Sequence, residues 1–170
     1  MDKFMEKIVA KRKTAVDFII IALVISVIML ALFFFVATNI RIGMGLDLLL
    51  LAGLIYLGYL IITSRNVEYE YIVTNGELDI DRIVSKRKRK RIFSASSKDF
   101  DVIAPVNSSS FTQLDLSIKN RIDASSSINS PDAYYFTLNY NNNRTLVIFE
   151  PDERMLNNFK LYIPRKVLNG

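Results

Sequence analysis

The part of this sequence best suited to binding chemistry is an unbroken block of cationic side chains at residues 86–91, which reads KRKRKR. It directly follows the stretch NVEYEYIVTNGELDIDRIVS, which contains alternating apolar residues and an Asn-Gly pair. Cations at this density attract phosphate groups, on lipid headgroups or on nucleic acid. The block therefore predicts a contact surface, and its ligand depends on where the chain places it.

This chain has few of the residue types that commonly carry out catalysis. There is no cysteine and no histidine, which removes thiolate sites and the commonest metal ligand and general base. Serines with a lysine base are the remaining nucleophile arrangement, although strings of serine are more typical of loops. The serines and the lysine in question are Ser94, Ser96, Ser97, Lys98, Ser108, Ser109, Ser110, Ser125, Ser126 and Ser127. We expect no catalytic residue and no cofactor.

A cation site is the other chemical alternative. Glu70, Asp79 and Asp81 lie close together in the alternating stretch, but their spacing is not that of a calcium-binding loop. We expect no bound metal, and we expect the acids of this stretch to face water.

Two apolar runs, at residues 18–38 and 42–62, precede the alternating stretch. A run of this length forms a helix of roughly 30 Å, which matches the hydrocarbon thickness of a bilayer. Buried helices of a soluble core and a cleaved signal peptide are the alternatives; the remaining chain is too short to cover two wholly apolar helices, and the second run follows the first at once. The predicted segments are a basic cytoplasmic N-terminus at 1–15, transmembrane helices at 16–38 and 42–63, an external loop at 39–41, and a cytoplasmic β-rich domain at 66–170.

The distribution of cations predicts the orientation of the two spans. Lys3, Lys7 and residues 11–13 flank the first span, and Arg65 with the basic block follows the second, whereas the loop carries only Arg41. By the positive-inside rule both termini are cytoplasmic, in an integral protein of the cell membrane with two spans.

Alternating residues and turn signals after residue 65 predict antiparallel strands. Asn75-Gly76 is typical of a two-residue hairpin turn, and pairing about it would place Val73 opposite Leu78 and Tyr71 opposite Ile80. Further strands are expected at 98–106, 111–118, 133–140 and 144–150, and a helix at about 151–163, after Pro151. The fold class is a membrane α-helical hairpin plus an α+β domain of antiparallel strands with a C-terminal helix.

The stretches VEYEYIVTNGELDIDRI and TLVIFEPDERMLNNFKLYIPRKV, placed after a transmembrane hairpin, resemble an uncharacterised family of small bacterial membrane proteins, a domain of unknown function. The strand with the pattern Y-x-(I/V)-T and its Asn-Gly turn are also similar to bacterial pleckstrin-homology-like domains. That second resemblance implies a seven-stranded, helix-capped PH-like barrel used for binding or assembly, without catalytic residues. Function does not follow from a fold alone.

The predicted hairpin returns the chain to the lipid surface at the basic block, because its two strands cover the same distance in opposite directions. Outside the block, acids outnumber cations from residue 66 onward, so we expect no nucleic-acid partner. We expect a non-catalytic binding or scaffold module; an accessory subunit or homo-oligomer assembled through the transmembrane helices is the alternative. The expected contacts with anionic headgroups are Arg65, Lys86, Arg87, Lys88, Arg89, Lys90, Arg91, Lys11, Arg12 and Lys13.

Overall fold

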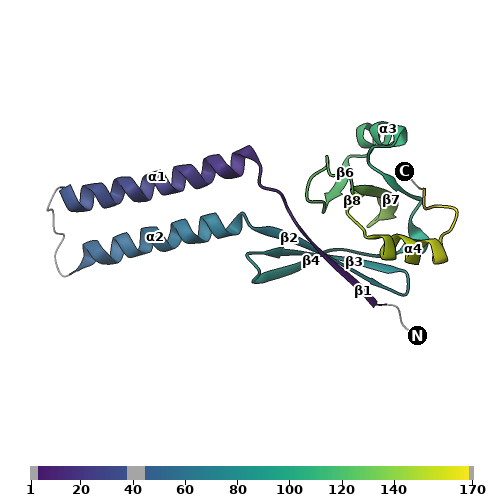
Figure 1. Cartoon of the computed structure of the whole chain (residues 1–170), viewed down its shortest axis with the longest axis horizontal. Helices are drawn as coiled ribbons and strands as arrows, with labels where there is room; N and C mark the ends of the chain where they lie inside the picture. Colours follow the sequence, from purple (N-terminus) through teal and green to yellow (C-terminus); the bar gives the residue numbers. More distant parts are fainter. Residues whose placement is uncertain (1–3, 38–44, 169–170) are drawn as a thin grey trace. The chain divides into compact units, whose positions relative to one another are not determined.

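The computed structural model describes residues 4–37 and 45–168, so the predicted loop at 39–41 lies outside the described residues. The chain divides into two units (Figure 1): Lys13–Val67 is one, and Met1–Arg12 together with Glu68–Gly170 is the other. The sequence prediction treated residues 1–15 as a separate basic segment. The structure groups residues 4–12 with the domain that follows the helices.

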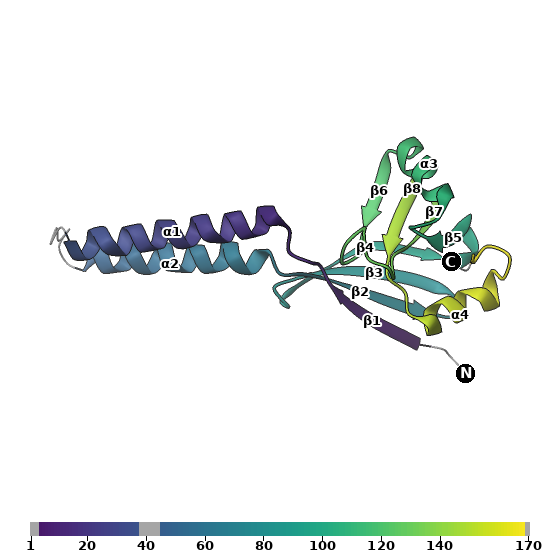
Figure 2. The same ribbon diagram turned by 45° about the horizontal axis from the view of Figure 1, so that its top comes forward.

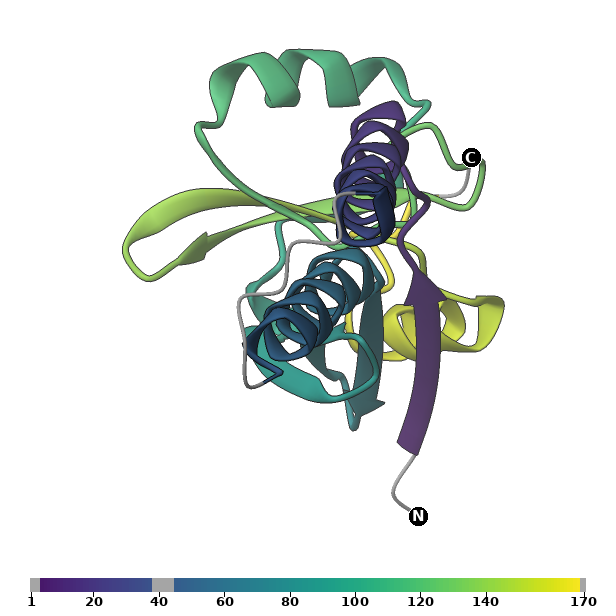
Figure 3. The ribbon, with the colours of Figure 1, turned by 90° about the vertical axis from the view of Figure 1, so that its left-hand side faces the viewer.

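The first unit is a pair of helices, α1 at Ala15–Ala37 and α2 at Leu46–Ser64. Both are long and apolar enough to cross a membrane, and none of the residues of α1 is buried. The helices lie side by side (Figures 1 and 3), and they approach closely at Gly58, where a Cβ atom would lie 2.6 Å from Cδ1 of Ile28. A residue without a side chain therefore allows this contact.

Polar residues interact at the end of the helical unit where α1 begins and α2 ends. Thr14 and Asp17 form a capping box at the start of α1: the Thr14 N–H donates to Asp17 Oδ2 at 2.8 Å, and the Asp17 N–H donates to Thr14 Oγ1 at 3.4 Å. Arg65, which follows α2, lies 3.8 Å from the Asp17 carboxylate. The ends of the two helices are thus joined by an ion pair.

The first sheet of the second unit has the strand order β1-β2-β3-β4. Its strands are β1 at Phe4–Ala10, β2 at Val67–Thr74, β3 at Glu77–Val84 and β4 at Lys88–Ser96. β1 precedes the helices in the sequence and β2 follows them, yet the two pair antiparallel, from Phe4 opposite Thr74 to Ala10 opposite Glu68. The sequence analysis did not predict β1.

The second sheet has the order β5-β7-β8-β6. Its strands are β5 at Val102–Pro105, β6 at Asn120–Asp123, β7 at Tyr134–Tyr140 and β8 at Asn143–Phe149. β6 pairs with β8 in parallel, and the other pairs are antiparallel. Figure 2 shows this sheet over one side of the first, with strands that run in a different direction.

Aromatic side chains form the core between the two sheets. Phe93 of β4 packs against Phe136 of β7 with ring centroids 5.3 Å apart, and Phe136 stacks on Phe100 at 4.0 Å. Helix α4, at Glu153–Tyr162, adds Phe159, whose ring lies 6.3 Å from that of Phe149. All of these rings are fully buried, so their packing stabilises the association of the sheets with the helix.

A buried tyrosine ties the sheets together through its hydroxyl group. Tyr71 of β2 donates to the carbonyl oxygen of Ala124 at 2.6 Å and accepts from the N–H of Glu150 at 3.2 Å. Burial raises the pKa of Tyr71 well above its usual range, so the hydroxyl keeps its proton and remains a donor.

The fold class is confirmed: an apolar helical hairpin, largely antiparallel sheets and a C-terminal helix. The described residues form eight strands in two sheets, where the resemblance implied seven. The strand predicted at 98–106 covers only Val102–Pro105, because Ser97–Asp99 forms a short 3₁₀ helix. Residues 111–118, predicted as a strand, belong instead to helix α3 at Ser109–Ser117. Phe111, Leu114 and Ile118 recur at helical spacing and pack into one apolar cluster with Tyr135, so burial of one helix face outweighs the alternating pattern.

Candidate functional site

The basic block forms the turn between β3 and β4 and the first half of β4. The turn spans Val84 to Arg87, and the Arg87 N–H donates to the Val84 carbonyl oxygen at 3.1 Å. Ser85 and Lys86 both have positive φ, of 54° and 55°. All six cations of the block are exposed. The turn thus presents charge at the start of β4.

Pairing with β3 sorts the cations of β4 onto two faces. Lys88 lies opposite Val84 and Lys90 opposite Arg82, whereas Arg89 lies opposite Ile83. Because successive side chains of a strand point to opposite faces, the two arginines of β4 share one face and the two lysines share the other.

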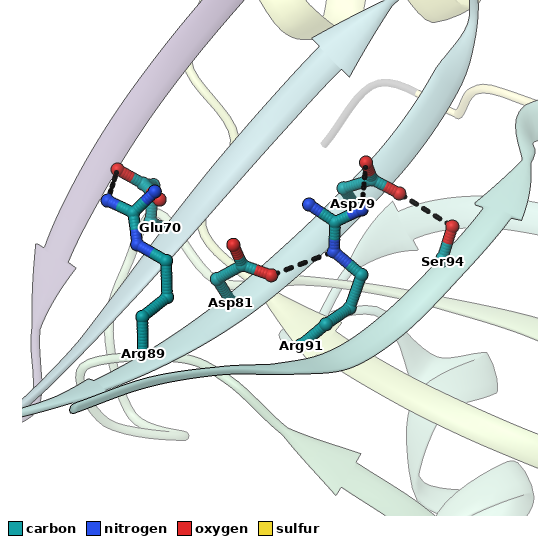
Figure 4. A network of polar contacts seen from close by, with 6 residues as sticks. All are labelled: Glu70, Asp79, Asp81, Arg89, Arg91 and Ser94. Carbon is teal, nitrogen blue, oxygen red and sulfur yellow. Dashed lines mark hydrogen bonds and ion pairs between the residues drawn. The ribbon is translucent and has the colours of Figure 1, made fainter.

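The arginine face carries a network of ion pairs (Figure 4). Arg89 donates from Nη2 to Oε1 of Glu70 at 2.8 Å. Arg91 donates from Nε to Oδ1 of Asp81 at 2.9 Å, and its Nη1 atom lies 2.8 Å from Oδ2 of Asp79. The guanidinium of Arg91 therefore lies between two carboxylates of β3 and holds β4 to its neighbour.

The prediction that the acids of this stretch face water is wrong for two of them. Glu70 is 2% exposed and Asp81 is 4% exposed, because the long arginine side chains of β4 lie over them. Among the described residues, no group of three acidic side chains is arranged to hold a metal ion. Glu70, Asp79 and Asp81, which the cation alternative assigned to a metal ion, are paired with the guanidinium groups of Arg89 and Arg91.

Glu70 occupies an unusual environment for a carboxylate. Its Oε1 atom accepts from Arg89, while its buried Oε2 atom has no hydrogen-bond partner. Burial raises the pKa of Glu70 above its ordinary value; Arg89 opposes the shift, and the carboxyl groups of Glu6 and Asp81 add to it. Glu6 belongs to β1, so this charge cluster includes the strand that precedes the helices.

A cavity of about 520 Å³ opens beside the basic turn. Its lining comes from all four strands of the first sheet and the β3–β4 turn. The lining residues are Ile8, Glu68, Ile83, Lys86, Arg87 and Arg89. Three cations, one carboxylate and two aliphatic side chains make a net positive surface with an apolar part.

The turn and the cavity lie at one particular end of the first sheet. Ala10 and Glu68 form the last pair of β1 and β2, and they are the strand residues close in sequence to α1 and α2. Val84, at the end of β3, lies at the same end, because β2 and β3 are neighbouring strands joined by the short turn at Asn75. The basic turn therefore lies at the end of the sheet where the chain departs for the helices.

The other predicted contact residues are divided between the two units. Lys11 and Arg12 belong to the second unit, where the Arg12 N–H donates to the Ser126 carbonyl oxygen at 3.0 Å. Lys13 and Arg65 belong to the helical unit. The structure thus brings six of the predicted residues together in one turn and strand, and it separates the rest between units.

Three serines of the enzyme alternative donate hydrogen bonds to carboxylates. Ser126 donates from Oγ to Oε1 of Glu150 at 2.7 Å, and Ser125 donates from Oγ to Oδ1 of Asp123 at 2.6 Å. Ser94 donates to Asp79. A hydroxyl that donates to a carboxylate in the folded domain stabilises its loop or strand.

Sequence reasoning missed two features of this site. It missed Ile8 and Glu6, because their strand lies in a short basic flank and its partner lies beyond both helices. The available signal was the alternation of Met5, Lys7 and Val9, whose side chains all point to the more buried face. It also missed the pairing of the arginines with the acids.

Comparison with known families identifies a match over nearly the whole chain. The family model described as a bacterial PH-like domain, DUF6106, matches residues 1–169, which include both helices and all strands of the two sheets. Comparisons with curated proteins and with solved structures found no match.

Proposed function

The chain belongs to the DUF6106 family of bacterial PH-like domains, and from this premise we propose that it is a membrane-anchored, non-catalytic binding module. The helical hairpin is the anchor, and the PH-like domain is the contact surface on the cytoplasmic side. The turn at Lys86–Lys88 contacts anionic lipid headgroups, and the cations at 11–13 and Arg65 flank the two spans in the sequence.

The observation that carries this proposal is the pairing of β1 with β2. These strands flank the helical hairpin, so one continuous sheet forms only if residues 4–10 and 67–74 are on the same side of the membrane. Two spans return the chain to the side from which it started, which agrees with this requirement. The excess of cations in the flanks supports a cytoplasmic location for that side.

Short connections support contact between the basic turn and lipid. Residues 11–14 link β1 to α1, and residues 65–66 link α2 to β2. At about 3.5 Å per extended residue, the longer of these connections, with four residues, spans at most about 14 Å. Each cation near an anionic surface contributes about 1 kcal/mol of attraction within a Debye length, so a few cations orient the domain.

The ion pairs of β4 support a narrower contact surface than the whole block. Arg91 is held between two carboxylates, Asp79 and Asp81. Lys90 lies farther along the strand opposite Arg82. We therefore assign the contact to Lys86, Arg87, Lys88 and Arg89. Assembly with a second copy or a protein partner through α1 remains a separate proposal, supported by the unburied surface of that helix.

The test measures the distance between the domain and the lipid surface in the full chain. A donor fluorophore is attached to a single cysteine at Lys98→Cys, which is free of background because the chain has no cysteine. The protein is reconstituted into phosphatidylcholine vesicles with and without phosphatidylglycerol, and energy transfer to a headgroup-labelled lipid is recorded at low and high salt. We expect higher transfer with phosphatidylglycerol, and the increase should disappear at high salt.

A charge-matched pair of variants completes this test. The double variant Lys86→Gln/Lys88→Gln should abolish the increase in energy transfer. The control variant Lys119→Gln/Arg165→Gln removes the same charge elsewhere on the domain, and most of the increase should remain. Equal energy transfer in both lipid mixtures would contradict the proposed lipid contact.

A further inference from the structure

The β3–β4 turn uses residue types that its backbone does not favour. In two other hairpin turns of this domain, positive φ values fall on Asn75 and Gly76, at 51° and 83°, and on Asn141 and Asn142, at 49° and 63°. Glycine and asparagine adopt this left-handed conformation most readily. In the β3–β4 turn the same conformation is adopted by Ser85 and Lys86.

A lysine in this conformation is a departure with a physical cost. The left-handed region brings Cβ close to the following carbonyl oxygen, which glycine avoids. The structure therefore keeps a long cationic side chain at a position where glycine would stabilise the turn. Residues held in such conformations concentrate at functional sites, where the side chain serves a purpose other than stability.

Lys86 is also one of the cations that line the cavity beside the turn. Arg89 also lines this cavity, and its Nη2 atom donates to Oε1 of Glu70 at 2.8 Å. A guanidinium group has five N–H donors, so this ion pair leaves others for an anion. Glu70 is thus a positioning residue: it orients Arg89 and does not itself line the cavity.

The remaining lining residues indicate the kind of anion. Ile8, which is 53% exposed, and Ile83 provide apolar surface next to the cations. Glu68 provides a carboxylate that can accept from a hydroxyl group. Phosphate, hydroxyl and hydrocarbon occur together in the headgroup region of an anionic phospholipid. A free phosphate ion has no apolar group that could pack against the two isoleucines.

We propose that this cavity binds the phosphate group of a single anionic phospholipid, with Lys86, Arg87 and Arg89 as its cationic ligands. This inference rests on the proposed function and adds to it a defined site of one lipid per chain. Because Ile8 belongs to β1, the site is complete only when the strand that precedes the helices is paired in the sheet.

Native mass spectrometry of the full chain in a zwitterionic detergent tests the proposal, because it counts bound lipid molecules. The probes are phosphatidylglycerol, phosphatidylcholine with the same acyl chains, and sn-glycerol 3-phosphate. We expect the first phosphatidylglycerol molecule to bind about tenfold more tightly than phosphatidylcholine, as one or two charge-assisted hydrogen bonds would give. Glycerol phosphate should bind weakly, and equal binding by it would overturn the assignment to lipid.

Two variants that remove the same charge separate a defined site from general attraction. Lys86→Gln should weaken the first binding event by about tenfold. Lys90→Gln changes the neighbouring strand on the opposite face and should have less than about a twofold effect. Equal weakening by both variants would overturn the site and leave the proposed function intact, whereas an absence of any preference for phosphatidylglycerol in the parent would overturn both.

A third variant uses the conformation of the turn. Lys86→Gly relieves the left-handed backbone, so we expect a higher melting temperature together with loss of the preference for phosphatidylglycerol. A variant that gains stability and keeps the parent's lipid affinity would overturn the role of Lys86.

Discussion

Ile8 lies directly opposite Glu70 in the first sheet, although both apolar helices separate these residues in the sequence. The pair shows that the PH-like domain is assembled from segments on both sides of the helical hairpin. It also links the charge cluster of β4 to the N-terminal strand, since Glu6 is close enough to Glu70 to influence its pKa.

The stability of the domain should depend on β1. Val9 is 7% exposed, so Val9→Asp would bury a carboxylate without a partner and should lower the unfolding free energy by about 2–4 kcal/mol. Phe4→Asp introduces the same group at a residue that is 62% exposed in the same strand, and it should cost at most about 0.5 kcal/mol. Thermal unfolding of the full chain in detergent, followed by the near-ultraviolet circular dichroism of its tyrosines, measures both. Equal melting temperatures would show that β1 is dispensable.

Gly76 should not tolerate a side chain. Its φ is 83°, and a Cβ atom there would lie 2.8 Å from Cγ of Tyr162 in α4. We expect Gly76→Ala to destabilise the domain by about 1–3 kcal/mol, from backbone strain and steric overlap together. In a Tyr162→Ala background only the strain remains, so the same substitution should cost less. An identical cost in both backgrounds would argue against the contact between the turn and the helix.

Arg91 should contribute more to stability than its neighbour Lys90. Arg91→Gln leaves Asp81, which is 4% exposed, without its cation and should lower the unfolding free energy by about 1–2 kcal/mol. The estimate is modest because the arginine side chain is 49% exposed and partly screened by solvent. Lys90→Gln is the matched control and should be close to neutral. Chemical denaturation would refute the ion-pair network if the two variants were equally stable.

The raised pKa of Glu70 gives stability a defined dependence on pH. Between pH 4.5 and the raised value, the folded chain holds a proton at Glu70 that the unfolded chain releases. The stability that protonation of Glu70 contributes to the folded chain is therefore fully present below its ordinary pKa. This stability is lost as the pH rises through the pKa of Glu70 in the folded chain. We expect the stability of the parent relative to Glu70→Gln to fall as the pH rises from 4.5 toward neutral. Melting temperatures of both proteins over this range check the sign, and a relative stability that increases with pH would contradict it.

The helices and the hairpin turns could be predicted from the sequence because their signals are local. The run at 18–38 has no charged residue, and Asn75-Gly76 has the composition that its backbone requires. β1 could not be found in the same way, since its pairing partner lies beyond both helices. The apolar residues at 111–118 fit both the period of a strand and the period of a helix. Only the packing of Phe111 distinguishes the helix from the strand.

The arrangement of the basic block depends on a β-bulge that could not be predicted from the sequence. The pairing of β3 with β4 shifts between Ile80 and Asp81, so that Ile80 lies opposite Phe93 and Asp81 lies opposite Arg91. This bulge determines which alternate cations of the block face the acids. Without it the lysines and arginines would exchange faces, and Glu70 would face a different side chain.

The proposed function requires a domain that forms on one side of a membrane from both flanks of a two-span hairpin. The most direct test introduces single cysteines into the cysteine-free chain, at Asn39 and at the exposed Lys98, and treats intact cells with a membrane-impermeant thiol reagent. We predict labelling at residue 39 in intact cells and labelling at residue 98 only after the cells are opened. Labelling of residue 98 in intact cells, with residue 39 protected, would contradict the cytoplasmic placement of the domain and the lipid contacts that follow from it.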